Sequence, residues 1–282
     1  MKTILKSPAK INLTLDILGQ DEASGYHFVN SVMQKIPWIY DEIEIEVLED
    51  LLDGETKIDF FCHSCGNRNL GLPTNKIPAF AGITVKDNTL WQAVEIMRRE
   101  TGHLENVYIK VKKNIPMQSG LGGGSSNAAQ VLKFLNKFWK LKKSRRILAQ
   151  LGAEIGMDVP FFIYGGTALA SHFGEIIEPL PNLKISENDL EIVFTDVNIS
   201  TKEAYENLNL KKCGLRKQDT LNFLNNIKND TKFKNLIKHF HNDVENTVLE
   251  SLPEFAEFFK KNNLDLNKVH LCGSGGAIFL LI

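Results

Sequence analysis

Alternating apolar and polar residues predict several strands in the first part of the chain. Apolar side chains occupy every second position over residues 11–17, 43–47 and 107–111. This period of two is typical of a strand that buries one face. Residues 58–62 are a further apolar stretch, and we expect it to form a strand that pairs with residues 43–47.

Three segments show the spacing of amphipathic helices instead. After Asn88-Thr89, which can cap a helix, the apolar residues from 90 to 97 share one helical face. A second apolar stripe starts near Ser125 and continues to Phe138, and a third predicted helix covers residues 144–155.

The pattern changes after Gly156. Residues 161–164 and 168–170 are predicted strands around a glycine pair, and another strand is predicted at 190–195. A short helix is expected at 201–208, a helix-rich region over 215–263, and two closing strands at 269–272 and 277–282. We therefore predict an α+β protein with two domains, residues 1–160 and residues 161–282.

Composition narrows the classes of function. The 282 residues carry a formal net charge of −1, so no basic field favours nucleic acid or an acidic membrane surface. No apolar run approaches the roughly 20 residues of a membrane helix, and residues 1–8 do not resemble a secretory signal. We expect a cytoplasmic protein with reduced cysteines that acts on a small molecule.

Two segments carry little predicted chemistry. Cys62-His63-Ser64-Cys65 could be half of a zinc site, but no second ligand pair follows at a matching spacing, which favours an ordinary strand-to-loop segment. Residues 66–86 are longer than a usual structureless loop and are interpreted as a surface insertion.

The strongest chemical signal is a glycine-rich segment between a predicted strand and a predicted helix. Glycines admit positive φ and let the backbone approach a ligand closely, while the start of the helix offers N–H groups to an anion. The alternative is a flexible glycine loop; neither a P-loop nor a dinucleotide fingerprint fits the spacing. The candidate phosphate-binding residues are Pro116, Met117, Gln118, Ser119, Gly120, Leu121, Gly122, Gly123, Gly124, Ser125 and Ser126.

Two charged residues could supply the chemistry of an alcohol kinase. Lys10 lies with Asn12 on the polar face of the first strand, and Asp158 stands among apolar residues. A carboxylate can orient a hydroxyl or take its proton, and an ammonium can stabilise the developing charge. Taken alone, Lys10 could be a solvated lysine and Asp158 a turn or cap residue.

Two further motifs are weaker. Tyr26 offers a ring for stacking and His27 an imidazole for hydrogen bonding, which suits a nucleobase or sugar, although both could belong to an ordinary turn. Residues 272–276 form a second glycine-rich turn that alone indicates only a tight turn.

Together these segments resemble the GHMP kinase superfamily, whose three motifs appear here in order. They are Pro8-Ala9-Lys10-Ile11-Asn12-Leu13, then the glycine loop, then Gly273-Ser274-Gly275-Gly276. The resemblance covers residues 7–279. It implies an N-terminal domain like domain 2 of ribosomal protein S5 and a ferredoxin-like C-terminal domain, with the site between them.

Gly25-Tyr26-His27 and the segment after Asp158 resemble the branch of this superfamily that works in the non-mevalonate isoprenoid pathway. The resemblance implies ATP-dependent phosphorylation, with Mg2+, of the 2-hydroxyl of a cytidine diphosphate-linked methylerythritol. Lys10 and Asp158 would be the catalytic pair. Asn12, Tyr26, His27 and Thr201 would contact the substrate, and no protein metal ligand is assigned.

The chain departs from that family pattern in four places. Asn127 stands where the family usually has Asp, which would remove an acidic helper for Mg2+. Residues 19–25 are one residue longer than usual and lack the usual Arg and Asp, and residues 66–86 are an unusual insertion. Relatives usually continue past the third motif with a helix and a strand, so we expect an incomplete C-terminal sheet.

Two alternatives remain open at this point. Asn127 and the short C-terminal region are compatible with a nucleotide-binding protein that does not turn over. A kinase for another small alcohol, such as homoserine or mevalonate, is disfavoured by the Tyr26-His27 pair.

Overall fold

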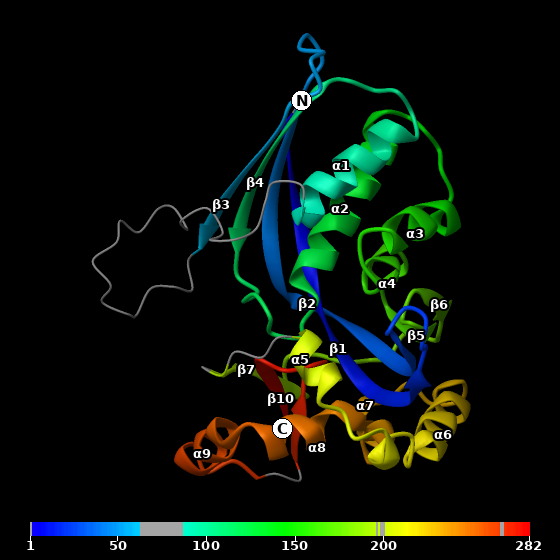
Figure 1. Cartoon of the computed structure of the whole chain (residues 1–282), viewed down its shortest axis with the longest axis vertical. Helices are drawn as coiled ribbons and strands as arrows, with labels where there is room; N and C mark the ends of the chain where they lie inside the picture. The colour runs from blue at the N-terminus through cyan, green and yellow to red at the C-terminus, as the bar shows by residue number, and fades with distance from the viewer. Residues whose placement is uncertain (1, 63–86, 196, 198–200, 266–267) are drawn as a thin grey trace. The chain divides into compact units, whose positions relative to one another are not determined.

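The computed structural model describes residues 2–62, 87–195, 197, 201–265 and 268–282. The chain divides into two compact units (Figure 1). The first contains residues 1–9, 36–116 and 122–164, and the second contains residues 10–35, 117–121 and 165–282. Strands β1 (Lys2–Gln20) and β2 (His27–Leu48) contribute residues to both units. The last change between units, after Tyr164, lies near the predicted boundary at residue 160, and that boundary stays a prediction.

The sheet of the first unit is built on β4 (Asn106–Lys113), which lies between two partners. The β2 strand pairs with β4 in antiparallel fashion, with Ile45 opposite Ile109. Strand β3 (Thr56–Cys62) pairs with the other edge of β4 in parallel. The predicted partner of β3 was therefore wrong. A parallel neighbour needs a crossover, and α1 lies on the connection from β3 to β4.

Helices cover one side of this sheet (Figure 1). Helices α1 (Thr89–Arg99) and α2 (Gly123–Phe138) bury apolar stripes that include Val94, Met97 and Leu132. Asn88 caps α1 by accepting a hydrogen bond from the Leu90 N–H, and Ser144 caps α3 (Arg145–Ala153) in the same way. All three helices confirm the periodicity in the sequence, because each presents its apolar face to the core.

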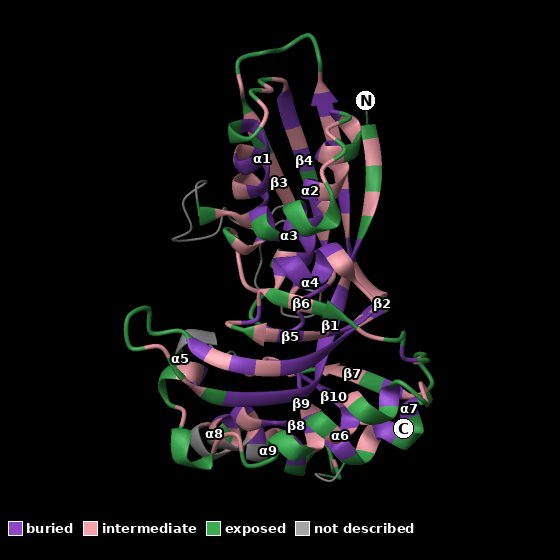
Figure 2. Cartoon of the chain, turned by 90° about the vertical axis from the view of Figure 1, so that its right-hand side faces the viewer, coloured by how far each residue is buried: buried purple, intermediate pink, exposed green. Residues whose placement is uncertain are grey.

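Residues 161–164 are helical, contrary to the strand prediction. They belong to α4 (Val159–Tyr164), whose first five residues are all buried (Figure 2). A short run that is apolar all round has no periodicity that separates a buried helix from a buried strand. The helix packs against α2 and α3.

The second unit contains a three-stranded antiparallel sheet in the order β7-β10-β9. These strands are β7 (Leu190–Phe194), β10 (Ala277–Leu281) and β9 (Val269–Leu271), and they confirm the strands predicted at 190–195, 277–282 and 269–272. In the same unit, residues 29–34 of β2 pair with β5 (Thr167–His172), which pairs with β6 (Ile176–Pro179). Residues 14–15 of β1 pair in parallel with β8 (His241–Asn242).

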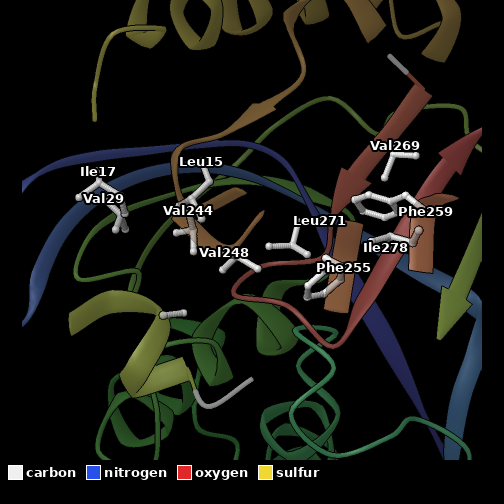
Figure 3. Packing of buried hydrophobic residues seen from close by; sticks show 11 residues of the cluster. Leu15, Ile17, Val29, Val244, Val248, Phe255, Phe259, Val269, Leu271 and Ile278 are labelled. Carbon is white, nitrogen blue, oxygen red and sulfur yellow. The ribbon is translucent and has the colours of Figure 1, made fainter. Parts of the chain in front are cut away.

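The predicted helix-rich region of the second unit is confirmed, and it also contains the short strand β8. It contains α6 (Lys217–Ile227), α7 (Phe233–Leu236), α8 (Asp243–Ser251), α9 (Pro253–Lys261) and the 3-10 helix η3 (Ile237–His239). Before it lie α5 (Thr201–Glu206), which confirms the short helix predicted at 201–208, and the 3-10 helix η2 (Leu210–Lys212). Figure 3 shows the core that joins α8 and α9 to β1, β9 and β10. Its buried members include Leu15, Val248, Phe255, Leu271 and Ile278.

Candidate active site

The glycine-rich loop connects β4 to α2 through residues with left-handed backbone. Gln118, Gly120 and Gly122 have φ values of 56°, 73° and 70°. Gly122 is the N-cap of α2 and, having no side chain, leaves the first turn uncapped. The first N–H groups of a helix have no intrahelical acceptor and carry partial positive charge, so this geometry suits a phosphate group.

The start of α2 is fixed from several directions within the first unit. The Thr89 hydroxyl donates to the Gly124 carbonyl at 3.2 Å. The Ser7 hydroxyl donates to the Ser126 hydroxyl at 2.8 Å, and both serines are fully buried. A Cβ added at Gly123 would lie 3.2 Å from the Lys113 ammonium, so a cation lies beside the first helical residue. That ammonium is paired with the buried Asp41 carboxylate.

Asn127 is the residue expected to weaken metal handling. It is buried in α2, and its Oδ1 has no hydrogen-bond partner among the described residues. A buried unpaired carbonyl oxygen is costly unless a ligand or water satisfies it. Among the described residues, no group of three or more acidic, His or Cys side chains could hold a metal ion.

The second unit brings the two glycine-rich turns together. A Cβ added at Gly120 would lie 1.6 Å from the Cys272 carbonyl oxygen, and one added at Gly276 would lie 2.2 Å from the Gln118 carbonyl oxygen. The two backbones are therefore in direct contact, and only glycine fits at these points. The motifs are more than 150 residues apart in the sequence, and the sequence alone did not indicate this contact.

Lys10 and Asn12 form the polar face of β1 that the sequence predicted. Lys10 Nζ donates to Asn12 Oδ1 at 2.8 Å, and Asn12 Nδ2 donates to the Ser31 hydroxyl at 2.7 Å. Lys10 and Asn12 are 4% and 5% exposed, so neither is a solvated surface residue. A Cβ at Gly273 would lie 3.3 Å from Lys10 Nζ and 3.4 Å from Asn12 Oδ1, which places both side chains against the third motif.

The Tyr26-His27 pair is divided between two aromatic neighbours. The centroid of the His27 ring lies 5.3 Å from the centroid of the Tyr205 ring, which belongs to α5. The half-exposed Tyr26 ring lies 5.4 Å from Phe173. Burial lowers the pKa of His27, so its imidazole is neutral at pH 7 and can donate one hydrogen bond and accept another.

Asp158 immediately precedes α4 and is half-buried. Its segment passes close to the glycine loop, because a Cβ at Gly156 would lie 3.8 Å from the Ser125 hydroxyl. Asp158 and Lys10 belong to different compact units, and their pairing stays a prediction.

Several predicted features fall outside the described residues. The insertion at 66–86 and three residues of Cys62-His63-Ser64-Cys65 do so, while Cys62 ends β3. Thr201 begins α5, but its side chain is not described. No helix in the described part of the chain is long and apolar enough to cross a membrane.

Comparison with known proteins identifies the family. Residues 88–166 match the model for the GHMP kinases N terminal domain. A 4-diphosphocytidyl-2-C-methyl-D-erythritol kinase of Alkaliphilus metalliredigens is 36% identical over 277 residues, which cover 98% of this chain and 86% of the relative. The enzyme of that name from Clostridioides difficile is 33% identical over 278 residues, covering 98% and 85%. This chain belongs to the 4-diphosphocytidyl-2-C-methyl-D-erythritol kinase family.

Solved structures agree with this family. A crystal structure of 4-(cytidine 5'-diphospho)-2C-methyl-D-erythritol kinase has a TM-score of 0.69 and 25% identity, and the alignment covers 99% of this chain and 90% of that one. A homoserine kinase from Cytophaga hutchinsonii, with a TM-score of 0.64 and 17% identity, shares the fold. The predicted GHMP kinase fold is confirmed, and the protein is an ATP-dependent small-molecule kinase. Neither a protein without turnover nor a kinase for another alcohol is favoured.

Proposed function

We propose that this kinase transfers the γ-phosphoryl group of ATP to the 2-hydroxyl of 4-diphosphocytidyl-2-C-methyl-D-erythritol, a step in isoprenoid precursor biosynthesis. The observation that carries the proposal is the buried chain from Lys10 through Asn12 to Ser31, which lies against the glycine turn of the third motif. A buried ammonium held by an amide, beside a glycine-rich turn, suits the stabilisation of phosphoryl charge.

The phosphates of ATP would lie on the loop from Pro116 to Ser126. The uncapped N-terminus of α2 would bind the negative charge, beside the Lys113 ammonium that is paired with Asp41. Gly120 and Gly276 must be glycines because a Cβ at either position would collide with the backbone of the other turn.

The transfer step needs few covalent partners. The substrate hydroxyl oxygen attacks the γ-phosphorus while the bond to the β-γ bridging oxygen breaks, and ADP leaves. In this proposal the Asp158 carboxylate orients the hydroxyl and accepts its proton, while the Lys10 ammonium stabilises the charge that develops on the transferred group.

Mg2+ is part of the proposal as the ion that accompanies ATP. The unpartnered Oδ1 of Asn127 and the hydroxyls of Ser125 and Ser126 are oxygen donors of the kind Mg2+ accepts. Because this set contains no carboxylate, it fits an ion held mainly by ATP and water. The ion would neutralise phosphate charge during transfer.

Recognition of the cytidine group would fall to the residues around His27. A neutral buried imidazole can read both a donor and an acceptor on a pyrimidine base, and aromatic rings provide a stacking surface. Tyr205 joins Tyr26 and Asn12 in this proposed set, because its ring lies beside that of His27. Thr201, four residues earlier on α5, retains its proposed substrate contact.

A substrate panel tests the proposal. Purified protein is incubated with ATP, Mg2+ and either the cytidyl substrate, homoserine or mevalonate, and ADP release is measured in a coupled assay. We expect turnover with the cytidyl substrate alone. Folded protein that turns over none of the three, or prefers another alcohol, would contradict the proposal.

A further inference from the structure

The start of α8 carries three polar side chains that bind backbone rather than one another. Asn242, at the end of β8, donates from Nδ2 to the Gly273 carbonyl at 2.7 Å and to the Leu271 carbonyl at 3.3 Å. Glu245 accepts from the Leu271 N–H at 2.8 Å. Asp243 accepts from the N–H groups of Ile17 and Gly214 at 2.8 Å and 2.6 Å.

These contacts fix one end of the third glycine motif. Asn242 is 6% exposed, and its Oδ1 caps α8 by accepting from the Val244 N–H at 3.0 Å. The same amide therefore ties the start of a helix to the turn at residues 272–276. Leu271 is also fixed by its side chain, which lies in the core with Val248 (Figure 3).

The turn that Asn242 holds has almost no freedom on its other side. Gly273 would place a Cβ 2.9 Å from the Gly120 carbonyl oxygen and 3.3 Å from Lys10 Nζ. Gly276 would place a Cβ 2.2 Å from the Gln118 carbonyl oxygen. A displacement of the turn toward the loop would therefore bring it against the Gly120 carbonyl, beside the Lys10 ammonium.

We propose that Asn242 is a positioning residue of this kinase, which, with Glu245, holds the 272–276 turn in the place where it supports the nucleotide loop and Lys10. Asn242 contacts neither ATP nor the substrate in this account. The inference rests on the proposed nucleotide role of the glycine loop. Misplacement of catalytic groups by about 1 Å can cost up to about a hundredfold in rate.

The substitution Asn242→Asp tests this role, and Asn242→Ser removes the same donor without adding a negative charge. An aspartate keeps the acceptor that caps α8, because Asp is as good an N-cap as Asn. It has no N–H to donate, so its carboxylate faces the carbonyl oxygens of Leu271 and Gly273. The cap is retained and the support of the turn is lost.

Asn136 provides a matched control. Its Nδ2 donates to the Lys143 carbonyl at 3.1 Å, and its Oδ1 accepts from the Lys143 N–H at 2.9 Å. It lies 13 residues from Gly123 along α2, about 20 Å at the helical rise. Asn136→Asp therefore removes the same kind of donor at a site without a proposed role in binding.

The primary measurement is calorimetric binding of a non-hydrolysable ATP analogue to the whole protein. We expect Asn242→Asp to raise Kd by about tenfold or more at unchanged stoichiometry and to lower kcat. Asn136→Asp should leave Kd and kcat within about twofold of the wild-type values. A merely structural role would lower the melting temperature or the active fraction without changing Kd. Equal Kd and kcat for the two variants would overturn the proposal.

A second variant and a wild-type assay complete the experiment. If Asn242→Asp does not fold, Asn242→Ser replaces it, since serine also caps a helix but is too short to reach the turn. The wild type is assayed beside the variants. An inactive wild type speaks against the proposed function, whereas a fully active and tightly binding Asn242 variant speaks against the positioning role.

Discussion

Asp16 and His241 form a buried ion pair across β1 and β8, with 2.8 Å between Oδ1 and Nε2. The other ring nitrogen of His241 lies 2.9 Å from the His239 carbonyl oxygen. Both ring nitrogens therefore face acceptors, which requires both to carry hydrogen. His241 is also the residue through which β8 pairs with Thr14 of β1.

The pair makes stability depend on pH. Burial opposes the charge on His241, but the bonds to Asp16 and the His239 carbonyl prevail and raise the pKa of His241. A raised folded-state pKa means that the stabilisation is complete below about pH 6.5 and is lost as the pH rises through the folded value. We expect Asp16→Asn, which keeps an acceptor but loses the charge, to lower the free energy of unfolding by about 1–3 kcal/mol at pH 6 and by less at pH 9. Urea unfolding at both pH values measures this, and an equal loss at both would contradict it.

Glu245 makes the free energy of unfolding depend on pH in a second pH range. Desolvation raises the pKa of this carboxyl to about 7, although the Leu271 N–H bond and the charges of Arg216 and His241 act in the opposite direction. Stability that the protonated acid provides below about pH 4.5 is lost as the pH rises through 7. Glu245→Gln keeps an acceptor for Leu271 and removes the charge. We expect it to raise the free energy of unfolding at pH 8 by up to about 3 kcal/mol and to change little at pH 4.5.

The control for this prediction is Glu254→Gln in the first turn of α9, where the side chain is exposed. That variant should show no gain at pH 8. A Glu245→Gln protein that is no more stable than wild type at pH 8 would mean that the carboxyl ionises at its ordinary pKa.

Gly120 tests the contact between the two glycine turns. In Gly120→Ala the new Cβ would lie 1.6 Å from the Cys272 carbonyl oxygen, so one turn must move. Gly102 has nearly the same φ, +74° against +73°, but nothing within 4 Å of its Cβ position. We expect Gly102→Ala to cost about 1–2 kcal/mol of stability and to leave nucleotide binding unchanged. Gly120→Ala should also weaken binding of an ATP analogue by about tenfold or more; equal affinities would show that the contact is dispensable.

Local patterns predicted much of the fold because the elements are regular. Alternation located parts of β1, β2 and β4, and helical spacing located α1, α2 and α3. The expectation that residues 11–17 bury only one face was wrong, because residues 9–17 of β1 are buried on both faces. The strands proved longer than predicted, 19 residues for β1 and 22 for β2. The strand prediction failed at α4, where every face is apolar, and the two-residue β8 was too short to show a period.

The candidate site was predictable only in pieces. Lys10, Asn12 and the glycine loop stand out by residue type, whereas Ser31, Tyr205 and Asn242 carry no local signal. Their importance comes from partners far along the chain: Ser31 from Asn12, Tyr205 from His27 and Asn242 from Gly273. The contact of Gly120 with Cys272 likewise depends on how the second unit folds, which no short window of sequence contains.

His27 tests recognition of the cytidine group. If its neutral imidazole reads the base, His27→Ala should raise KM for the cytidyl substrate by about 10- to 100-fold, the cost of one or two lost hydrogen bonds to a buried base. KM for ATP should change less than about twofold. His103, which stacks on Trp139 in the first unit, is the control, and His103→Ala should leave both constants unchanged. A rise in KM for ATP alone would place His27 on the nucleotide side.

Asp158 tests the proposed proton acceptor. Asp158→Asn keeps the size of the side chain and its ability to cap a turn, but an amide cannot accept the hydroxyl proton. We expect kcat to fall by about 10²- to 10⁴-fold, while Kd for an ATP analogue stays within about twofold. The control is Asp189→Asn, because Asp189 accepts hydrogen bonds from Ser186 in a turn and has only that structural role here. If Asp158→Asn behaved like Asp189→Asn and retained turnover, the carboxylate would be a turn residue, and the proton would have to leave through another group.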